Sequence, residues 1–219
     1  MTEPDPVRLD RAQFAEVVRH PQAHAYILGQ YRIGEWAGVV ALQRLLDEMA
    51  PAGKLRHAME IHHRDEHRHS VVFTDWMQRL GTTPPALPTE VEGYFSTSPE
   101  EFRRQRETLM QLPPELRRIV VFAGINAIER LAFEQFEVHL ECLERAGDRE
   151  TLRGVMAEEK FHLSYVEREL ERQQKGPLGT VVTTALEQAQ ARFADFQTTR
   201  RAETRAAVER ILGGTKEAS

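Results

Sequence analysis

Apolar residues recur at steps of three and four along four long segments, the spacing that aligns side chains on one face of an α-helix. Prolines and glycines separate these segments and mark helix ends, with Gly147 and Asp148 read as a stop and an N-cap. The predicted long helices cover about 24–49, 54–80, 115–145 and 149–175. Further helices are predicted over about 10–20, 98–111 and 179–212, with a frayed tail from Gly213.

Ionisable residues occupy the middle of each apolar stripe. Two stripes carry one glutamate each, and the other two carry a Glu-x-x-His pair. Residues three apart leave the same face of a helix, so each pair can reach one metal ion. A carboxylate buried among apolar neighbours must be protonated, paired or bound to metal. The positions concerned are Glu35, Glu66, His69, Glu129, Glu159 and His162.

The two halves of the chain repeat this arrangement. The lone glutamates are 94 residues apart (35 to 129), and the members of the Glu-x-x-His pairs are 93 apart (66 to 159, 69 to 162). This offset indicates a two-fold internal repeat of a helix pair. The Pro-, Thr- and Gly-rich segment 82–98 is predicted to connect the halves. Two antiparallel helix pairs joined in this way predict an all-α four-helix bundle with one crossover.

Other glutamates compete for the same positions. Glu60 and His63 form a further Glu-x-x-His pair, but Glu60 lies off the apolar stripe. Glu134 and Glu137 break the step and the repeat offset that Glu129 keeps. The alternative to a metal site is a bundle with buried Glu–His or Glu–Arg pairs. Six groups on four inward stripes at repeat-consistent spacing favour the metal.

Ligand chemistry narrows the choice of metal. Four carboxylates and two imidazoles suit iron or manganese better than copper or zinc. The single cysteine, Cys142, excludes an internal disulfide, a four-cysteine zinc site and an appended rubredoxin-type iron centre. We expect this cysteine to fill space on a helix.

The composition indicates one domain, or at most two, because 219 residues that are 41% hydrophobic suffice for one sizeable core. A net charge of −5 argues against a nucleic-acid partner. The N-terminus is polar, and no run of about 18 apolar residues occurs, so we expect a cytoplasmic protein without a membrane span. The expected parts are an N-terminal arm (1–23), the bundle (24–175) and a C-terminal helix and tail (176–219).

The ligand set resembles that of the ferritin-like di-iron carboxylate proteins over about residues 24–175. The resemblance implies a ferritin-like four-helix bundle with its long crossover between helices two and three, plus an additional C-terminal helix. It implies two iron ions, with an iron/manganese pair as the alternative. It assigns bridging positions to Glu66 and Glu159, terminal positions to Glu35 and Glu129, and one metal each to His69 and His162.

The same resemblance suggests roles for neighbouring residues. Asp65 and Glu158 each precede a bridging glutamate and resemble the carboxylates that hydrogen-bond the outer nitrogen of the opposite histidine. His62 lies four residues before Glu66, where it is either a seventh ligand or a buried histidine with ordinary partners. Tyr31 resembles the redox-active tyrosine of ribonucleotide reductase, although a core tyrosine is the simpler interpretation.

The implied function is that of a non-haem di-iron oxygenase or oxidase. Such a protein uses dioxygen as co-substrate for hydroxylation, N-oxygenation or a related oxidation of a small, largely apolar molecule. A separate ferredoxin or reductase would supply electrons, because the chain carries no flavin or iron–sulfur motif. Gly38 and Ala132 would leave space beside the metals or permit close helix packing. The expected lining of the dry pocket is Phe73, Phe122, Phe133 and Phe136.

Two other functions remain open at this point. One is iron handling, as a ferroxidase or a rubrerythrin-like peroxide scavenger. The other is a metal-bound structural module. The C-terminal helix is expected to cover the bundle or to form a homodimer contact, rather than to act as a substrate lid.

Overall fold

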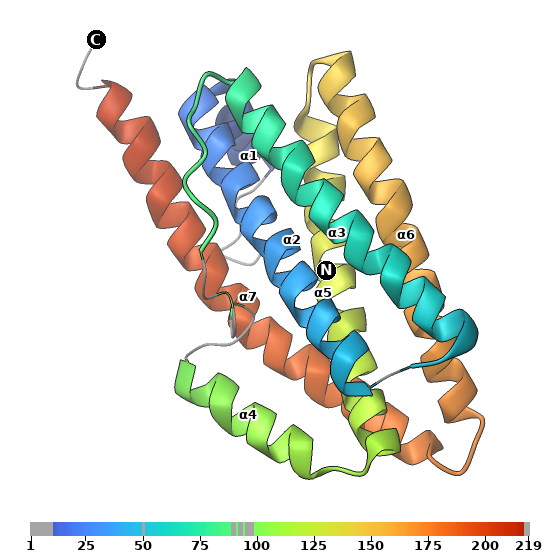
Figure 1. Ribbon diagram of the computed structural model, residues 1–219. Helices are drawn as coiled ribbons and strands as arrows, with labels where there is room; N and C mark the ends of the chain where they lie inside the picture. Colours follow the sequence, from blue (N-terminus) through green and yellow to red (C-terminus); the bar gives the residue numbers. More distant parts are fainter. Residues whose placement is uncertain (1–10, 50, 89–90, 92–93, 95–98, 217–219) are drawn as a thin grey trace.

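The computed structural model describes residues 11–49, 51–88, 91, 94 and 99–216, and these contain helices and no strand. The all-helical prediction is therefore confirmed for this part of the chain. The helices are α1 (Arg11–Arg19), α2 (Pro21–Met49), α3 (Gly53–Arg79), α4 (Pro99–Gln111), α5 (Pro114–Cys142), α6 (Ala146–Gln174) and α7 (Gly179–Lys216) (Figure 1). Residues 1–10 of the predicted arm and parts of the predicted connection lie outside the described residues.

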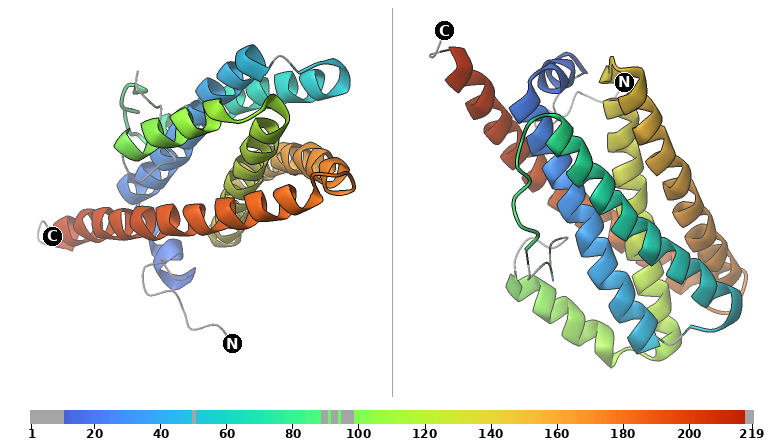
Figure 2. Two further views of the ribbon diagram at one scale, coloured as in Figure 1. Left: turned by 90° about the horizontal axis from the view of Figure 1, so that it is seen from below. Right: turned by 45° about the horizontal axis from the view of Figure 1, so that its top comes forward.

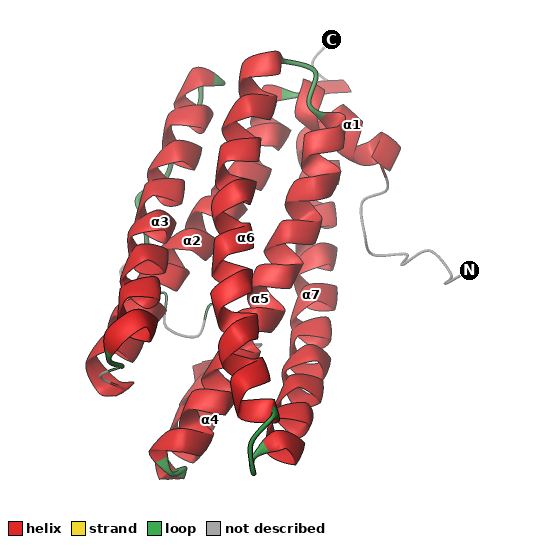
Figure 3. Ribbon diagram, turned by 90° about the vertical axis from the view of Figure 1, so that its right-hand side faces the viewer, coloured by secondary structure: helices red, strands yellow, loops and turns green. Residues whose placement is uncertain are grey.

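Two helix pairs form the centre of the bundle. α2 packs against α3, α5 packs against α6, and α3 also contacts α6 (Figures 1 and 3). α3 and α5 both begin at the lower end of the bundle in Figure 1, so the connection between them returns along its length. α7 lies beside α5 and contacts α6 and α2, while α4 crosses the lower end (Figure 2).

Helix ends agree with the sequence pattern at some positions and differ at others. α2 begins three residues before the predicted start, because proline at the first helical position lacks only an N–H that has no helical partner there. Gly81 follows α3 with a φ of 77°, which suits glycine and matches the predicted end. α7 continues past Gly213, contrary to the predicted fraying; glycine costs only about 1 kcal/mol in a helix.

The turn between α5 and α6 corrects a prediction. α5 ends at Cys142 rather than near Arg145, and Arg145 is the N-cap of α6, without a side-chain capping hydrogen bond. Gly147 and Asp148 therefore lie inside the first turn of α6. A carboxylate there is favourable at the positive end of the helix dipole. Asp148 also lies 3.9 Å from both Arg79 and Arg145.

Two apolar clusters lie above and below the middle of the bundle. The upper cluster contains Phe73, Phe136 and Leu152, and the lower cluster contains Phe122 and Val166. Burying a large apolar side chain contributes about 1.5–3 kcal/mol, so these clusters hold the four helices in register. The ionisable positions of all four stripes lie between the two clusters, away from bulk water.

The peripheral helices also contribute to the core. Phe14 and Val17 of α1 are buried in the upper cluster. α7 covers the bundle, as expected, with Val182, Phe193 and Phe196 buried and Val181 exposed. Among the described helices, none combines the length and the apolar character needed to cross a membrane.

Candidate metal centre

Seven ionisable side chains from four helices meet between the two apolar clusters. None of them is more than 7% exposed. α2 contributes one glutamate, α3 contributes three residues, α5 contributes one glutamate, and α6 contributes a Glu-x-x-His pair. They are Glu35, His62, Glu66, His69, Glu129, Glu159 and His162. The structure thus brings together all six of the ligands predicted from the sequence, and His62 with them.

The seven residues form two sets, each able to hold a metal ion. Within each set, one ligand atom from every residue lies within 4.8 Å of the others. Glu66 belongs to both sets, the position that a bridging carboxylate requires. The first set is His62, Glu66, Glu129 and His162, and the second is Glu35, Glu66, His69 and Glu159.

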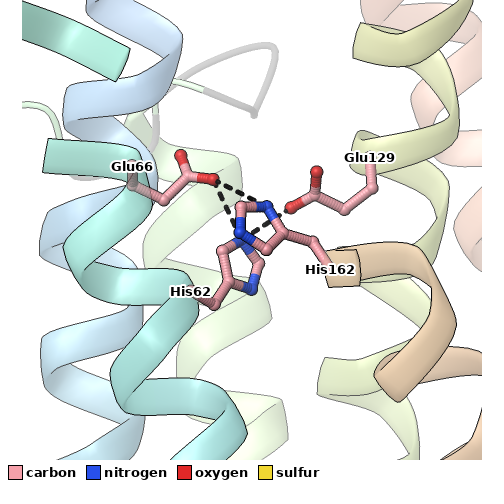
Figure 4. A group of neighbouring side chains, drawn as sticks. All are labelled: His62, Glu66, Glu129 and His162. Carbon is pink, nitrogen blue, oxygen red and sulfur yellow. Dashed lines mark hydrogen bonds and ion pairs between the residues drawn. The ribbon is translucent and has the colours of Figure 1, made fainter. Parts of the chain in front are cut away.

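In the first set, His62 points into the centre (Figure 4). Its Nε2 lies 2.9 Å from Glu66 Oε1 and 2.9 Å from Glu129 Oε1. Its ring stacks on that of His162, with centroids 3.7 Å apart. Its other nitrogen, Nδ1, lies 2.8 Å from the hydroxyl of Tyr165. If Nδ1 carries the proton and donates to that hydroxyl, the lone pair of Nε2 faces the carboxylates.

In the second set, Glu159 contacts two histidines. Its Oε1 lies 3.1 Å from His69 Nδ1, and its Oε2 lies 2.8 Å from His162 Nδ1. His69 Nδ1 is also 3.2 Å from Glu35 Oε2, and His162 Nδ1 is 3.6 Å from Glu66 Oε1. Glu66 and Glu159 therefore both reach across the middle of the centre, whereas Glu35 and Glu129 lie at opposite sides.

The outer nitrogens of two histidines meet the carboxylates expected from the sequence. His69 Nε2 lies 2.7 Å from Glu158 Oε2, and His162 Nε2 lies 3.4 Å from Asp65 Oδ2. An N–H donated outward to each carboxylate leaves the inner nitrogen free to bind metal. Arg68 was not foreseen: its guanidinium donates to Asp65 at 3.0 Å and also contacts Glu158, so it ties the two carboxylates together.

Electrostatics in the centre show why it needs positive charge. Burial and the charges of Glu35, Glu129 and Glu159 raise the pKa of Glu66 well above its ordinary value. Burial and the charge of Glu35 push the pKa of Glu159 upward too, but hydrogen bonds from His162 and His69 outweigh them and lower it to about 2. Four ionised glutamates in one buried volume carry four negative charges, which two divalent cations balance, leaving the histidines neutral.

The pKa values of His69 and Glu129 are shifted by burial and by the same buried negative charges. Burial favours the neutral form of His69, yet its contacts with Glu159 and Glu35 raise its pKa to about 12. Burial and the charge of Glu159 raise the pKa of Glu129. Protons therefore serve as the positive charge between these groups wherever a metal ion does not.

The competing residues lie outside the centre. Glu60 is exposed and accepts a hydrogen bond from Arg56 at 2.8 Å. Glu134 and Glu137 are also exposed. The apolar stripe and the repeat offset therefore identified which glutamates turn inward.

Gly38 makes room for a ligand. A Cβ atom at this position would lie 2.3 Å from Glu66 Oε2 and 3.0 Å from its Cδ. The space above Gly38 is thus filled by the carboxylate of Glu66, rather than left open beside the centre.

A cavity of ≈250 Å³ reaches the centre between α2, α5 and α7. Ala132 and Tyr31 line it. The predicted phenylalanine lining is wrong for three of its four residues, because only Phe136 lines the cavity. Phe73 and Phe122 are fully buried in the apolar clusters, and the ring of Phe133 lies 5.5 Å from Lys160 Nζ.

Tyr31 lines the cavity and also packs against a group of aromatic rings. Its ring packs against Phe73, Phe136 and His139 at centroid distances of 5.5, 4.9 and 5.7 Å. Burial raises the pKa of its hydroxyl. These contacts are those of a core tyrosine, the simpler of the two interpretations.

Sequence reasoning missed Tyr165 and Arg68. Tyr165 follows His162 by three residues, so its position on the inward face of α6 was available as a signal. Arg68 is 49% exposed by its side chain and carries no such signal. Comparison of the chain with models of known protein families, with curated proteins and with solved structures found no match.

Proposed function

We propose that this protein is a ferritin-like, non-haem di-iron enzyme that uses dioxygen to oxidise a small, largely apolar organic molecule. The observation that carries the proposal is the pair of buried ligand sets that share Glu66. Four carboxylates and three imidazoles suit iron or manganese. The direction of the helices, with α3 and α5 beginning at the same end, suits the ferritin-like crossover.

Each ligand has a role in this proposal. Glu66 and Glu159 would be shared by the two metal ions, as their contacts on both sides of the centre suggest. Glu35 and His69 would complete one metal site. Glu129 and His162 would complete the other, and His62 would add a third imidazole there, since its Nε2 faces Glu66 and Glu129.

The surrounding residues keep the ligands ready. Asp65 and Glu158 accept the outer N–H of His162 and His69, and the hydroxyl of Tyr165 holds the outer nitrogen of His62. Two iron ions would supply the redox chemistry and the open coordination positions for dioxygen. The electrons come from a separate ferredoxin or reductase.

The cavity favours an organic substrate over iron handling. It is mostly lined by apolar side chains, and it reaches five of the seven residues of the centre: Glu35, His62, Glu66, Glu129 and Glu159. Its volume is close to the lower end, about 300 Å³, of the range typical of small-molecule sites. A molecule bound there would exclude water from the centre and place one of its atoms beside the metals.

The proposal is tested by loading the protein with Fe²⁺ without oxygen and then adding ¹⁸O-labelled dioxygen together with small apolar candidate substrates. We expect a substrate-dependent optical change and an oxidised product, detected by mass spectrometry. Glu66→Gln should abolish both, whereas Glu134→Gln, which removes an exposed glutamate of α5, should leave them unchanged.

The iron-loaded protein, given dioxygen or peroxide, also separates the alternatives. Oxidation and release of iron without any organic product would indicate a ferroxidase, and rapid consumption of added peroxide would indicate a scavenger. Stoichiometric metal that consumes neither oxygen nor peroxide would indicate a structural site. Any of these results would contradict the oxygenase proposal.

A further inference from the structure

The charge of the cavity changes sign away from the metal centre. Among the described residues that line it, the charged side chains other than those of the centre are Arg200 and Arg201. Both belong to α7 and are partly buried. Apart from the centre, the charged side chains that line the cavity are therefore both positive, and Glu203, which accepts from Arg200, does not line it.

The structure holds one of these arginines in place. The guanidinium of Arg200 lies over the rings of Tyr94 and Phe196, at 4.9 and 5.5 Å from their centroids, and donates to Glu203 at 3.0 Å. Tyr94 and Phe196 themselves line the cavity. Stacking fixes the plane of the guanidinium, and an oriented guanidinium binds a carboxylate with two parallel hydrogen bonds.

Neutral polar groups accompany the arginines. Gln197 and Thr204 of α7 line the same part of the cavity, at helical steps of three and four from Arg200. They are partly buried. Other parts of the wall are apolar and buried, for example Ile27 and Phe136.

Apolar space continues into a second cavity. This cavity, of ≈260 Å³, shares Ala41, Leu45, Tyr94, Ile125 and Ile128 with the first. A chain bound in the first cavity therefore has further apolar space along α2 and α5.

We propose that the cavity binds a monocarboxylic acid with an unbranched apolar chain, its carboxylate on Arg200 and Arg201 and its chain directed toward the metal centre. That such an acid is oxidised rests on the proposed function; that it binds does not.

The charged groups around the second cavity fit a carboxylate less well. The lining of that cavity itself contains a carboxylate, Glu48, which pairs with Arg106. The other two arginines there are Arg44 and Arg192, and Arg192 donates to Gln105.

Decanoic acid is the probe, with decanamide as a neutral ligand of similar shape. Calorimetric titration is run without oxygen on the metal-free and the zinc-loaded full chain. We expect decanoate to bind more tightly than decanamide, and its affinity to fall with added salt. Arg200→Gln and Arg201→Gln should each weaken decanoate about ten-fold, the scale of one lost charged hydrogen bond, and leave decanamide within two-fold.

Two further variants keep the test independent of folding. Arg200→Lys keeps the charge and should retain most of the decanoate affinity. Arg205→Gln removes the same charge from α7 at a position that pairs with Glu209 and does not line the cavity, so it should bind as the wild type does.

Several results would overturn the assignment. They are equal affinity for decanoate and decanamide, unchanged affinity in both arginine variants, or an equal loss in Arg205→Gln. Loss of affinity in Arg192→Gln alone would place the carboxylate in the second cavity, and so would also contradict it. Binding to the zinc-loaded protein tests the site alone, because zinc is redox-inert. Decanoate that binds but is not oxidised in the iron-loaded protein would contradict the proposed function and leave this site intact.

Discussion

Gly38 determines where the carboxylate of Glu66 can lie. Any side chain at this position meets that carboxylate at less than 3 Å, so the glycine is as much a part of the centre as the ligands. Gly29, on the same helix, has ordinary space: a Cβ there would lie 3.6 Å from Met77 Cε. The two glycines therefore form a matched pair for substitution.

Gly38→Ala should displace Glu66 and weaken metal binding by about ten-fold or more, the scale seen when ligand-supporting groups are lost. Gly29→Ala should leave metal affinity unchanged and stabilise the fold by about 0.5–1 kcal/mol, because alanine favours the helix. Competition titration with a chelator measures the first effect and thermal unfolding the second. Equal metal affinity in both variants would contradict the role given to Gly38.

Arg68 is the second residue whose role appears only in three dimensions. It contacts both carboxylates that hold the outer histidine nitrogens. Arg68→Gln should loosen Asp65 and Glu158 together and weaken metal binding by about ten-fold. Arg64→Gln, an exposed neighbour on α3, is the control and should bind metal normally.

At the scale of single residues, the sequence predicted a site residue where both the residue type and its helical spacing were unusual. The six predicted ligands could be found because a glutamate or histidine interrupts an apolar stripe. The role of Gly38 in leaving space for the Glu66 carboxylate could not be predicted, because a small residue in a helix is equally consistent with close helix packing. The contact between His62 and Tyr165 joins α3 to α6, and no spacing within one helix encodes it.

Between helices, the most unusual contact is a second buried histidine pair that joins α2 to α5. His24 Nε2 and His139 Nε2 are 2.9 Å apart, and the ring of Trp76 stacks on that of His139 at 5.6 Å. Burial lowers the pKa of His24 to about 4, and burial together with His24 lowers that of His139 well below its ordinary value. Both rings are therefore neutral in the folded protein.

This pair should make the fold sensitive to acid. The unfolded chain takes up protons below about pH 6.5, whereas His24 in the folded protein does so only near pH 4. Its contribution is present above pH 6.5 and is lost as the pH falls, by about 2 kcal/mol at pH 5. Metal-free His24→Gln should lose less stability between pH 7.5 and 5 than the wild type, measured by urea unfolding. The exposed-site control His57→Gln should match the wild type. A loss in His24→Gln as large as in the wild type would contradict this explanation.

The helices themselves were largely predictable, because proline, glycine and the apolar step are local signals. Their ends were less so. Asp148 resembles an N-cap, yet it lies within the first turn, where its charge contacts Arg79 from α3. Long-range contacts of this kind decide the last turn of a helix, and they are not visible in a short segment of sequence.

For the whole molecule, the buried carboxylates of the centre should link metal binding to stability. An ion that binds only the folded chain adds about 2.7 kcal/mol at a concentration one hundred times its Kd. For 219 residues we therefore expect metal to raise the Tm by about 5–10 °C. Calorimetry of metal-free and Fe²⁺-loaded protein under nitrogen measures this shift.

Glu66→Gln provides the complementary case. It removes one buried carboxylate whose negative charge is repelled by those of three other glutamates. The metal-free variant should therefore unfold at a higher temperature than the metal-free wild type. Metal should then raise its Tm much less. A metal-free variant less stable than the wild type would mean that the carboxylate stabilises the fold by itself.

The cavity is the feature that the sequence could not provide. Its walls come from α2, α5 and α7, and its volume depends on how far these helices stand apart. The predicted phenylalanines lie near the ligands in sequence, but three of them pack into the apolar clusters or against Lys160 instead of lining the cavity. The arginines of α7 are 71 or more residues from Glu129 in sequence (129 to 200) and line the same cavity only through folding.

The central claim is that the buried carboxylates and imidazoles hold two metal ions. The most direct test is a crystal structure of the protein loaded with Fe²⁺ under nitrogen, with an anomalous difference map at the iron edge. We predict two peaks about 3.5–4 Å apart, both in contact with Glu66 and Glu159, one bound also by His62, Glu129 and His162 and the other also by Glu35 and His69. A map with no iron at these residues, or with one ion alone, would contradict the account.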